Sequence, residues 1–315
     1  MAISLFLGVT CFARAQSSPP IQPDPVFKVT TDIVVVDAQV LDKKTGRPVG
    51  GLKRGDFELL EDGVPQNIAY FSQNELPLSI VFLFDLTDSV RPVLKPLAGG
   101  ALEALQHLKP EDETAVMVYS ASAQLLQDFT TERALTVAAI QKASGMTSDE
   151  AAFFNEGVFQ AATQADKARN PGSRRVIIWL TDNVPNVPHE GVRTEEDAIR
   201  RLFETGTVVS CLLERSAMSN VMTALFTKNP LFAMRRKHHP PGDVFKYAEQ
   251  TGGQVMKSSK EDVASKLADL IDQIRTRYSL GYRPSAEQAA GTFCQIKLTV
   301  SPDSIVKAKR GYYRR

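Results

Sequence analysis

An aspartate, a threonine and a serine occupy alternate positions directly after an apolar run of the chain. The run 78–84 ends at Asp85, and Thr87 and Ser89 complete a D-x-T-x-S pattern. Side chains at alternate positions just past a strand can project to one side and converge on one point. Carboxylate and hydroxyl oxygens are the ligands that hard divalent cations prefer. The spacing therefore predicts a site for Mg²⁺ or Mn²⁺, with Ca²⁺ as an alternative.

A second carboxylate ends another strongly apolar run. Asp182 follows the segment 175–180 in the sequence Leu-Thr-Asp-Asn. Aspartate, serine and threonine are also common helix caps and turn formers, so each motif taken alone has a purely structural explanation. Two core strands that both end in aspartate favour a shared metal site. The whole chain has only 4 His and 3 Cys, which disfavours zinc and again indicates oxygen ligands.

The elements that must position these side chains alternate along the region 77–277. Continuous apolar runs between helical patterns are typical of a mostly parallel sheet with helices on both faces. In such sheets ligands bind outside the carboxyl ends of the strands. The expected strands are 78–84, 113–120, 123–129, 175–180, 207–213 and 254–257, and the expected helices are 93–108, 132–143, 151–167, 194–205, 242–250 and 260–277.

The two flanks of this region have a different pattern. Segments 27–76 and 278–315 contain short apolar stretches separated by Gly, Pro and Asp, which is typical of antiparallel strands. The later segment is expected to form strands at 278–282, 292–300 and 305–313. We predict a β-sandwich-like module built from both flanks around a doubly wound α/β domain, and the pairing of the flanks is a hypothesis.

The start of the chain indicates the compartment. The apolar run 3–12 precedes Ala13-Arg14-Ala15, so residues 1–15 are expected to be a cleaved signal peptide and 16–26 a linker. A buried N-terminal strand is the alternative. The protein is therefore expected to be secreted or to reside in the periplasm or cell envelope, with no transmembrane segment in the mature chain. Cleavage leaves Cys211 and Cys294, which are expected to be buried free thiols, with a disulfide as the alternative.

Charge and composition limit the class of partner. The 315 residues carry a formal net charge of +1, and 43% are hydrophobic, which is ordinary for a globular protein. Neither nucleic acid nor an anionic membrane is expected as the main partner. The most basic stretch contains Arg235, Arg236 and Lys237. It is either a solvated loop or a loop near the metal face that contacts an acidic partner.

The strand-end motifs resemble those of the von Willebrand factor type A domain. In that family a D-x-S-x-S motif, a later Thr and an Asp after the fourth strand form a metal-ion-dependent adhesion site. The resemblance implies that Asp85, Thr87, Ser89 and Asp182 face one cation. It also implies a fifth ligand from the later loop. Thr147 fits that position from the Gly-Met-Thr sequence, whereas alignment on the following helix puts Ala151 there.

The flanking segments resemble the VWFA-related proteins that are abundant in acidobacteria. The match spans roughly residues 27–313, and its motifs say little about biological role. The matching segments are VGGL at 49–52, GDFE at 55–58, EDGVPQ at 61–66, TGG at 251–253, YSLGYRP at 278–284 and RGYY at 310–313.

These observations predict a non-enzymatic protein-binding module. The resemblance implies that its cation would leave one coordination position open for a carboxylate of a partner protein. A metal-dependent hydrolase is the first alternative, because Mg²⁺ at such a strand edge can also polarise a phosphoryl group. A metal-free structural protein of the cell envelope is the second alternative.

Overall fold

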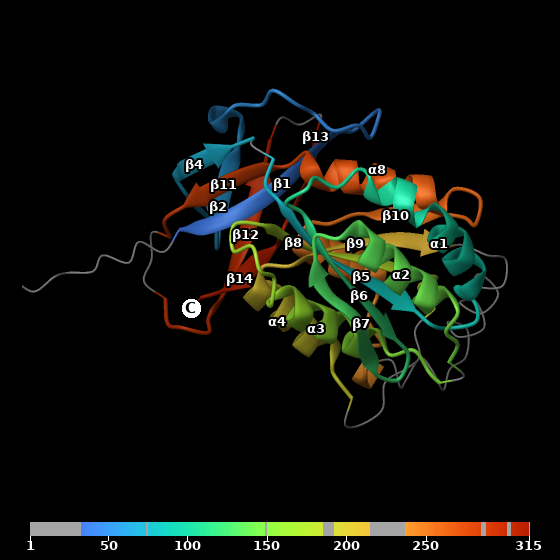
Figure 1. Ribbon diagram of the computed structural model, residues 1–315. Helices are drawn as coiled ribbons and strands as arrows, with labels where there is room; N and C mark the ends of the chain where they lie inside the picture. The colour runs from blue at the N-terminus through green and yellow to red at the C-terminus, as the bar shows by residue number, and fades with distance from the viewer. Residues whose placement is uncertain are drawn as a thin grey trace, which may run out of the picture. The chain divides into compact units, whose positions relative to one another are not determined.

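The computed structural model describes residues 33–73, 75–148, 150–184, 192–214, 237–284, 288–300 and 304–314. Figure 1 shows this part of the chain as a coloured ribbon. The expected signal peptide, the linker, and residues Arg235 and Arg236 of the basic stretch lie outside the described residues. Among the described residues, no helix combines the length and the apolar character needed to cross a membrane.

A six-stranded sheet forms the centre of the α/β region. Its strand order is β10-β9-β8-β5-β6-β7, and all neighbours are parallel except β7, which runs antiparallel to β6 at the edge. The strands are β5 (Leu78–Asp85), β6 (Glu113–Tyr119), β7 (Ala123–Thr130), β8 (Arg174–Thr181), β9 (Val208–Glu214) and β10 (Val255–Ser258).

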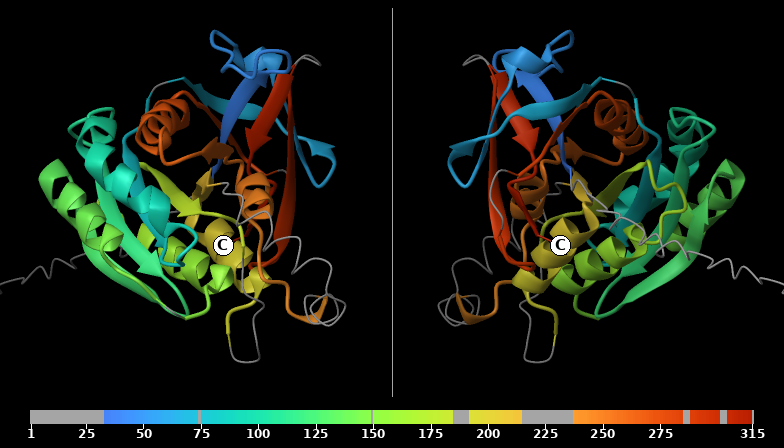
Figure 2. Two further views of the ribbon diagram at one scale, coloured as in Figure 1. Left: turned by 90° about the vertical axis from the view of Figure 1, so that its right-hand side faces the viewer. Right: turned by 90° about the vertical axis from the view of Figure 1, so that its left-hand side faces the viewer.

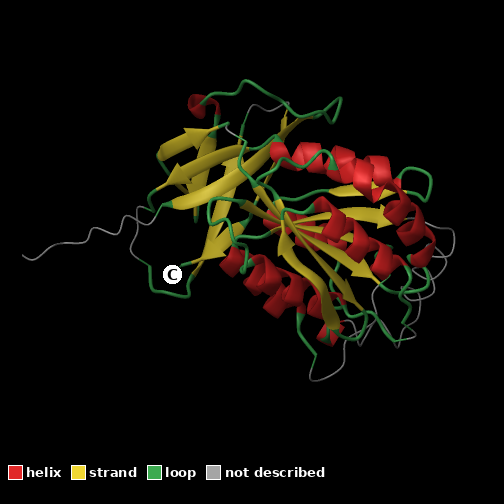
Figure 3. Cartoon of the chain, in the orientation of Figure 1, coloured by secondary structure: helices red, strands yellow, loops and turns green. Residues whose placement is uncertain are grey.

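Helices cover both faces of this sheet, as Figures 2 and 3 show. Alternate residues of β5 point to opposite faces. Phe82 and Phe84 pack with α1, α2 and α8, whereas Val81 and Leu83 pack with α3, α4 and α7. The prediction of a mostly parallel sheet between two helical layers is confirmed. The helices are α1 (Arg91–Leu105), α2 (Arg133–Ser144), α3 (Phe154–Ala165), α4 (Glu195–Thr205), α7 (Val244–Thr251) and α8 (Val263–Arg275).

Helix α1 runs without interruption through two glycines that the sequence would count against a helix. A Cβ atom placed on Gly100 would lie 2.4 Å from the Cβ of Ala264 on α8. The missing side chain therefore allows α1 and α8 to approach closely on the same face of the sheet. Packing between helices outweighs the propensity cost of glycine, which is about 1 kcal/mol relative to alanine.

Two antiparallel sheets are built from both ends of the described chain. One has the order β13-β1-β11-β4, and the other has the order β14-β12-β2-β3. Their shared core contains Val36, Leu59, Leu280 and Ile296. The remaining elements are β1 (Val34–Asp42), the 3₁₀ helix η1 (Arg54–Asp56), β2 (Glu58–Glu61), β3 (Val64–Pro65), β4 (Ile68–Ser72), β11 (Tyr278–Tyr282), β12 (Phe293–Thr299), β13 (Ser304–Ala308) and β14 (Gly311–Tyr313).

The segment expected as one strand at 305–313 forms two strands in different sheets. β13 pairs with β1, whereas β14 pairs with β12. Between them, the amide of Arg310 donates a 2.8 Å hydrogen bond to the carbonyl of Gln250 outside either sheet. A Cβ on Gly311 would lie 2.3 Å from the ring of Phe293, so this crossing requires glycine. The single-strand prediction was wrong because an apolar pattern does not reveal a change of sheet.

A buried ion pair joins the antiparallel sheets to the α/β region. The guanidinium of Arg174, at the start of β8, donates to the carboxylate of Asp37 on β1 at 3.1 Å. Arg174 also donates to the carbonyl of Ile274 on α8 at 2.8 Å, and Ser279 donates to Asp37 at 2.6 Å. Because Arg174 contacts both regions, it fixes the position of β8 against the β1–β11 pair.

The two cysteines within the described residues are free and buried. Cys211 lies on β9 and Cys294 on β12, and both are fully buried. This confirms the expectation of free thiols, and the disulfide alternative is wrong.

Candidate metal site

The candidate site lies where the chain changes direction across the sheet. From β5 the chain proceeds to β6 on one side, and it later returns to β8 on the other side. Asp85 is the last residue of β5, and Asp182 directly follows β8. The two strands are parallel neighbours, with Phe84 opposite Leu180. Ligands of open α/β sheets bind at such a switch point, so the topology brings both predicted carboxylates to the appropriate edge.

Asp85 is fully buried and accepts four hydrogen bonds. Its Oδ1 accepts from the amide of Thr87 at 3.0 Å and from the Thr87 hydroxyl at 2.8 Å. Its Oδ2 accepts from the Tyr119 hydroxyl and from the Thr181 hydroxyl, each at 2.9 Å. These bonds fix the orientation of the carboxyl group and satisfy its lone pairs.

Tyr119 and Thr181 are site residues that the sequence did not reveal. Tyr119 ends β6 directly opposite Asp85, and its hydroxyl accepts a 3.1 Å hydrogen bond from Nε1 of Trp179. Thr181 ends β8 next to Asp182. In sequence both residues belong to apolar strand runs and would be interpreted as core. Only the pairing of β6 and β8 with β5 indicates that they face Asp85.

The remaining predicted side chains lie beside this carboxyl group. The hydroxyls of Thr87 and Ser89 are 3.2 Å apart, so these two residues of the motif converge. The Ser89 hydroxyl also interacts with the carboxyl group of Asp182. Asp182 is 5% exposed, and its Oδ1 accepts from the amide of Val184 at 3.0 Å. Its Oδ2 is buried and has no hydrogen-bond partner among the described residues.

Burial raises the pKa of both carboxyl groups. The pKa of Asp85 rises to about 6, mainly through burial and further through the negative charge of Asp182, although the hydrogen bonds from Thr87 and Tyr119 counteract this. Burial also raises the pKa of Asp182. Two buried carboxylates with like charges thus disfavour each other's ionised form. A cation between them would remove this repulsion.

The donor set fits a hard divalent cation. The unpartnered Oδ2 of Asp182 is a free acceptor in a buried position. The Thr87 hydroxyl directs its single proton to Asp85 and accepts from Ser89, which leaves one lone pair of Thr87 available to a cation. Among the described residues, no three His, Cys, Asp or Glu side chains gather closely enough to hold a metal ion. A cation here would therefore rely on the carboxylate of Asp182 together with hydroxyls and water, with the charge of Asp85 close by.

The structure does not bring Thr147 into this hydrogen-bonded group. Thr147 is exposed in the loop between α2 and α3, and Ala151 is half-buried in the same loop. The loop contacts the end of β6 through Glu150, whose carboxylate accepts a 3.1 Å hydrogen bond from the Ser120 hydroxyl. The amide of Phe153 also donates to the carbonyl of Ser120 at 3.0 Å. Neither position proposed for the fifth ligand has a described contact with Asp85 or Asp182.

Asn183 fixes the turn that follows Asp182. It adopts a left-handed backbone conformation with φ of +58°, which asparagine tolerates better than most residues. Its side-chain amide donates to Asp243 at 3.1 Å, and its Oδ1 accepts from the amide of Val244 at 3.1 Å. The turn carrying Asp182 is thereby attached to the start of α7.

The known proteins that resemble this chain do so in three-dimensional structure and not in sequence. No protein-family profile matches the chain, and no curated protein matches it in sequence. Solved structures match with low identity. BatB from Bacteroides thetaiotaomicron is 15% identical, with a TM-score of 0.42 over 62% of this chain and 97% of that one. The vWF domain of the type V pili tip protein Mfa5 from Porphyromonas gingivalis is 11% identical, with a TM-score of 0.43 over 64% and 96%.

A third solved structure that matches this chain is only partly covered by it. The PilB minor pilin from Streptococcus sanguinis is 13% identical, with a TM-score of 0.44 over 65% of this chain and 63% of that one. The chain therefore spans less than two thirds of PilB. The assignment of the fold depends on the strand order and helical layers described above.

Proposed function

We propose that this protein is a secreted or cell-envelope binding module that holds one divalent cation, Mg²⁺ or Mn²⁺, at the ends of β5 and β8. Asp182, Thr87 and Ser89 contact the cation directly or through water, and Asp85 orients the Thr87 hydroxyl. The cation then binds a carboxylate of a partner protein at an open coordination position. In this proposal the protein performs no catalysis.

The observation that carries this proposal is the unpartnered Oδ2 of Asp182. Buried carboxylate oxygens are normally hydrogen-bonded, and an ionised one without a partner is costly. Here it lies at the switch point of the sheet, beside two hydroxyls and a second buried carboxyl group. A divalent cation would satisfy this oxygen and neutralise both charges. A structural cap would instead direct its oxygens to backbone amides, as Oδ1 of Asp182 does with Val184.

The first test is cation binding by native mass spectrometry and titration calorimetry with Mg²⁺ and Mn²⁺. Asp182→Asn should weaken binding on the order of 100-fold or more, because it removes a charged ligand. Asp88→Asn is the matched control, since Asp88 lies within the same motif but its side chain is 72% exposed and pairs with Arg91. Equal binding by the wild type and Asp182→Asn would overturn the proposal.

The second test concerns the partner's carboxylate. A short glutamate-rich peptide should bind in the presence of Mg²⁺ and lose binding when EDTA is added. The same peptide with glutamine in place of glutamate should not bind. Absence of any bound cation would favour the metal-free structural alternative. Hydrolysis of phosphoester or peptide substrates that disappears in Asp85→Ala would favour the hydrolase alternative.

A further inference from the structure

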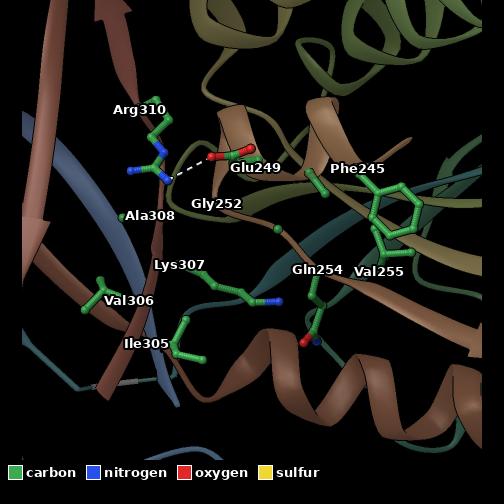
Figure 4. Close-up of a pocket in the computed structure, with 12 residues that line it drawn as sticks. Phe245, Glu249, Gly252, Gln254, Val255, Ile305, Val306, Lys307, Ala308 and Arg310 are labelled. Atoms are coloured by element: carbon green, nitrogen blue, oxygen red, sulfur yellow. Dashed lines mark hydrogen bonds and ion pairs between the residues drawn. The ribbon is translucent and has the colours of Figure 1, made fainter. Parts of the chain in front are cut away.

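A cavity lies between the antiparallel sheets and the α/β region, lined by residues of α7, β10 and β13. It has a volume of about 440 Å³, and Figure 4 shows its lining. Strand β13 lies close to the turn after α7. A Cβ atom on Gly252 would lie 2.4 Å from the backbone of Ala308, so only glycine fits this contact. The cavity opens beside this contact.

Two donors in the cavity lining have no acceptor within the part of the chain that the structure describes. Lys307 is half-buried and extends from β13 toward β10, with its amine near the side chain of Gln254 (Figure 4). Lys307 forms no ion pair with a described residue. Gln254 is 6% exposed, and its Nε2 is buried without a hydrogen-bond partner in the described part of the chain.

A buried arginine that does not itself line the cavity contacts one of the lining residues. Arg277 is 4% exposed, and its Nη2 donates to the carbonyl of Gly252, which lines the cavity. Its Nε and Nη1 are buried and have no acceptor among the described residues. The nearest acidic groups are already engaged, since Asp37 pairs with Arg174 and Glu249 pairs with Arg310. Neither Lys307 nor Arg277 forms an ion pair with a described residue, and Arg277 feels the charge of Asp37 only as a weaker contribution beside that of Arg174.

Titration behaviour agrees with this excess of positive charge. Burial lowers the pKa of Lys307, and the nearby charge of Arg277 lowers it further. Burial also lowers the pKa of Arg277 to about 10, with the charge of Arg174 as a second cause, although Asp37 opposes the change. Both groups would be better stabilised by an additional anion.

Apart from the ion pair between Glu249 and Arg310, the rest of the cavity lining is apolar. Phe245 is 45% exposed and Ile305 is 43% exposed, which is unusual for large apolar side chains at a concave surface. Ala248, Val255 and Val306 complete this part of the lining. Figure 4 shows Phe245 and Val255 next to each other, at the end away from Ile305. An apolar surface with a few convergent donors is the usual composition of a small-molecule site.

We propose that this cavity binds a small organic carboxylate with a short aliphatic body. Lys307 and the Gln254 amide would hold the carboxylate, with Arg277 providing additional positive charge. Phe245, Val255 and Ile305 would pack against the aliphatic part. The site is separate from the strand edge that carries Asp85 and Asp182, so neither proposal depends on the other.

Titration calorimetry of the full chain with sodium hexanoate tests this proposal. Hexanoate should bind the wild type, whereas hexanamide and hexylamine should bind at least ~10-fold more weakly, because they lack the negative charge. Binding should weaken as ionic strength rises. This comparison uses the wild type alone and therefore does not depend on the folding of any variant. Hexanamide or hexylamine binding as tightly as hexanoate would overturn the proposal.

A matched pair of variants assigns the site. Lys307→Met should weaken hexanoate binding ~10-fold or more, and Lys307→Arg should retain it, because the charge is kept. Lys297→Met is the control, since Lys297 is an exposed lysine on β12. Thermal unfolding verifies that each variant is folded. Unchanged hexanoate binding in folded Lys307→Met would overturn the assignment, and so would hexyl phosphate binding ~10-fold more tightly than hexanoate.

Discussion

Asp85 and Tyr119 lie opposite each other across the β5–β6 pair, and the Tyr119 hydroxyl donates a 2.9 Å hydrogen bond to Oδ2 of Asp85. The same hydroxyl accepts from Nε1 of Trp179. A buried chain of hydrogen bonds thus extends from the indole of Trp179 through Tyr119 to the candidate metal site. Trp179 and Asp85 therefore each lose a hydrogen bond if the hydroxyl oxygen of Tyr119 is removed.

Tyr119→Phe should lower the free energy of unfolding by ~2 kcal/mol, because Trp179 loses its acceptor and Asp85 loses a donor. It should also raise the pKa of Asp85 further and weaken cation binding at pH 6. Urea denaturation at pH 7 measures the first effect. Tyr70→Phe is the control, since Tyr70 is 45% exposed on β4 and should change stability little. Similar losses in the two variants would contradict the prediction.

The pKa of Asp85 predicts how the stability of the metal-free protein depends on pH. Its value rises from 3.8 to about 6 in the folded state, so the folded protein binds more protons than the unfolded chain between these values. Stability should therefore decrease as pH rises through this window, by ~3 kcal/mol from this group alone. Denaturation curves from pH 4 to 7 measure the slope. Asp85→Asn removes the titrating group, so its curve should lack this decrease.

Cation binding should have the opposite pH dependence. The negative charges of Asp182 and Asp85 both favour a cation at the site, so its affinity should decrease as Asp85 is protonated below about pH 6. Added Mg²⁺ should therefore stabilise the protein more at pH 7 than at pH 5. Equal stabilisation at the two pH values would indicate that Mg²⁺ binds elsewhere.

The ion pair between Arg174 and Asp37 predicts a large effect at the junction of the two regions. The side chain of Arg174 is 1% exposed and that of Asp37 is 20% exposed. Arg174→Met should lower the free energy of unfolding by ~3 kcal/mol or more, because it leaves a largely buried carboxylate without its partner. Lys266→Met is the control, because it removes the more exposed ion pair between Lys266 and Asp269 on α8. It should lower the free energy of unfolding by less than ~1 kcal/mol.

The effect of Arg174→Met should diminish in acid. Burial raises the pKa of Asp37, but the charge of Arg174 and the hydrogen bonds from Arg174 and Ser279 more than offset this and leave the pKa below its usual value. Because the pKa of Asp37 is lower in the folded protein than its unfolded value of 3.8, this group stabilises the protein above pH 3.8. That stabilisation is lost as the pH falls through the pKa of the folded state. If Arg174→Met lowered the free energy of unfolding by the same amount from neutral pH down to pH 2, this explanation would be contradicted.

Two glycines should respond in opposite ways to replacement by alanine. A Cβ on Gly253 would lie 1.8 Å from the carbonyl oxygen of Val209, so Gly253→Ala should cost ~3 kcal/mol. A Cβ on Gly99 would meet nothing within 4 Å, and Gly99 is an exposed position of α1. Gly99→Ala should therefore stabilise the protein by up to ~1 kcal/mol. Thermal unfolding compares the two variants directly.

The sequence predicted the strand-end positions of the candidate ligands, because these positions follow from local pattern. Asp85 and Asp182 could be found because each ends a continuous apolar run, which marks a buried parallel strand. Tyr119 and Thr181 could not be found, because a tyrosine or threonine in such a run is equally compatible with a core position. Their role depends on which strands are neighbours, and that information is not local.

Loops and changes of sheet were beyond prediction for a related reason. Thr147 was chosen from a three-residue resemblance, yet the length of a loop is not constrained by any periodicity. The described contacts of this loop with the end of β6 come from Glu150 and Phe153, and Thr147 as a cation ligand stays a prediction. Similarly, only Lys309 and Arg310 stand between β13 and β14 in sequence, and only the contacts of Arg310 and Gly311 separate the two strands. The unpaired donors around Lys307 also depend on tertiary neighbours.

The position of the α/β region between β4 and β11 has a topological consequence. The chain leaves the antiparallel sheet after Ser72 and re-enters it at Tyr278, and Ser72 lies opposite Ser279 on the neighbouring strand. Two antiparallel strands in this arrangement could be joined by a turn of about two to five residues. The whole α/β region therefore occupies the place of a hairpin loop. Recombination could exchange it as a cassette that leaves the order of the scaffold strands unchanged, provided that the incoming region again supplied a partner for Asp37.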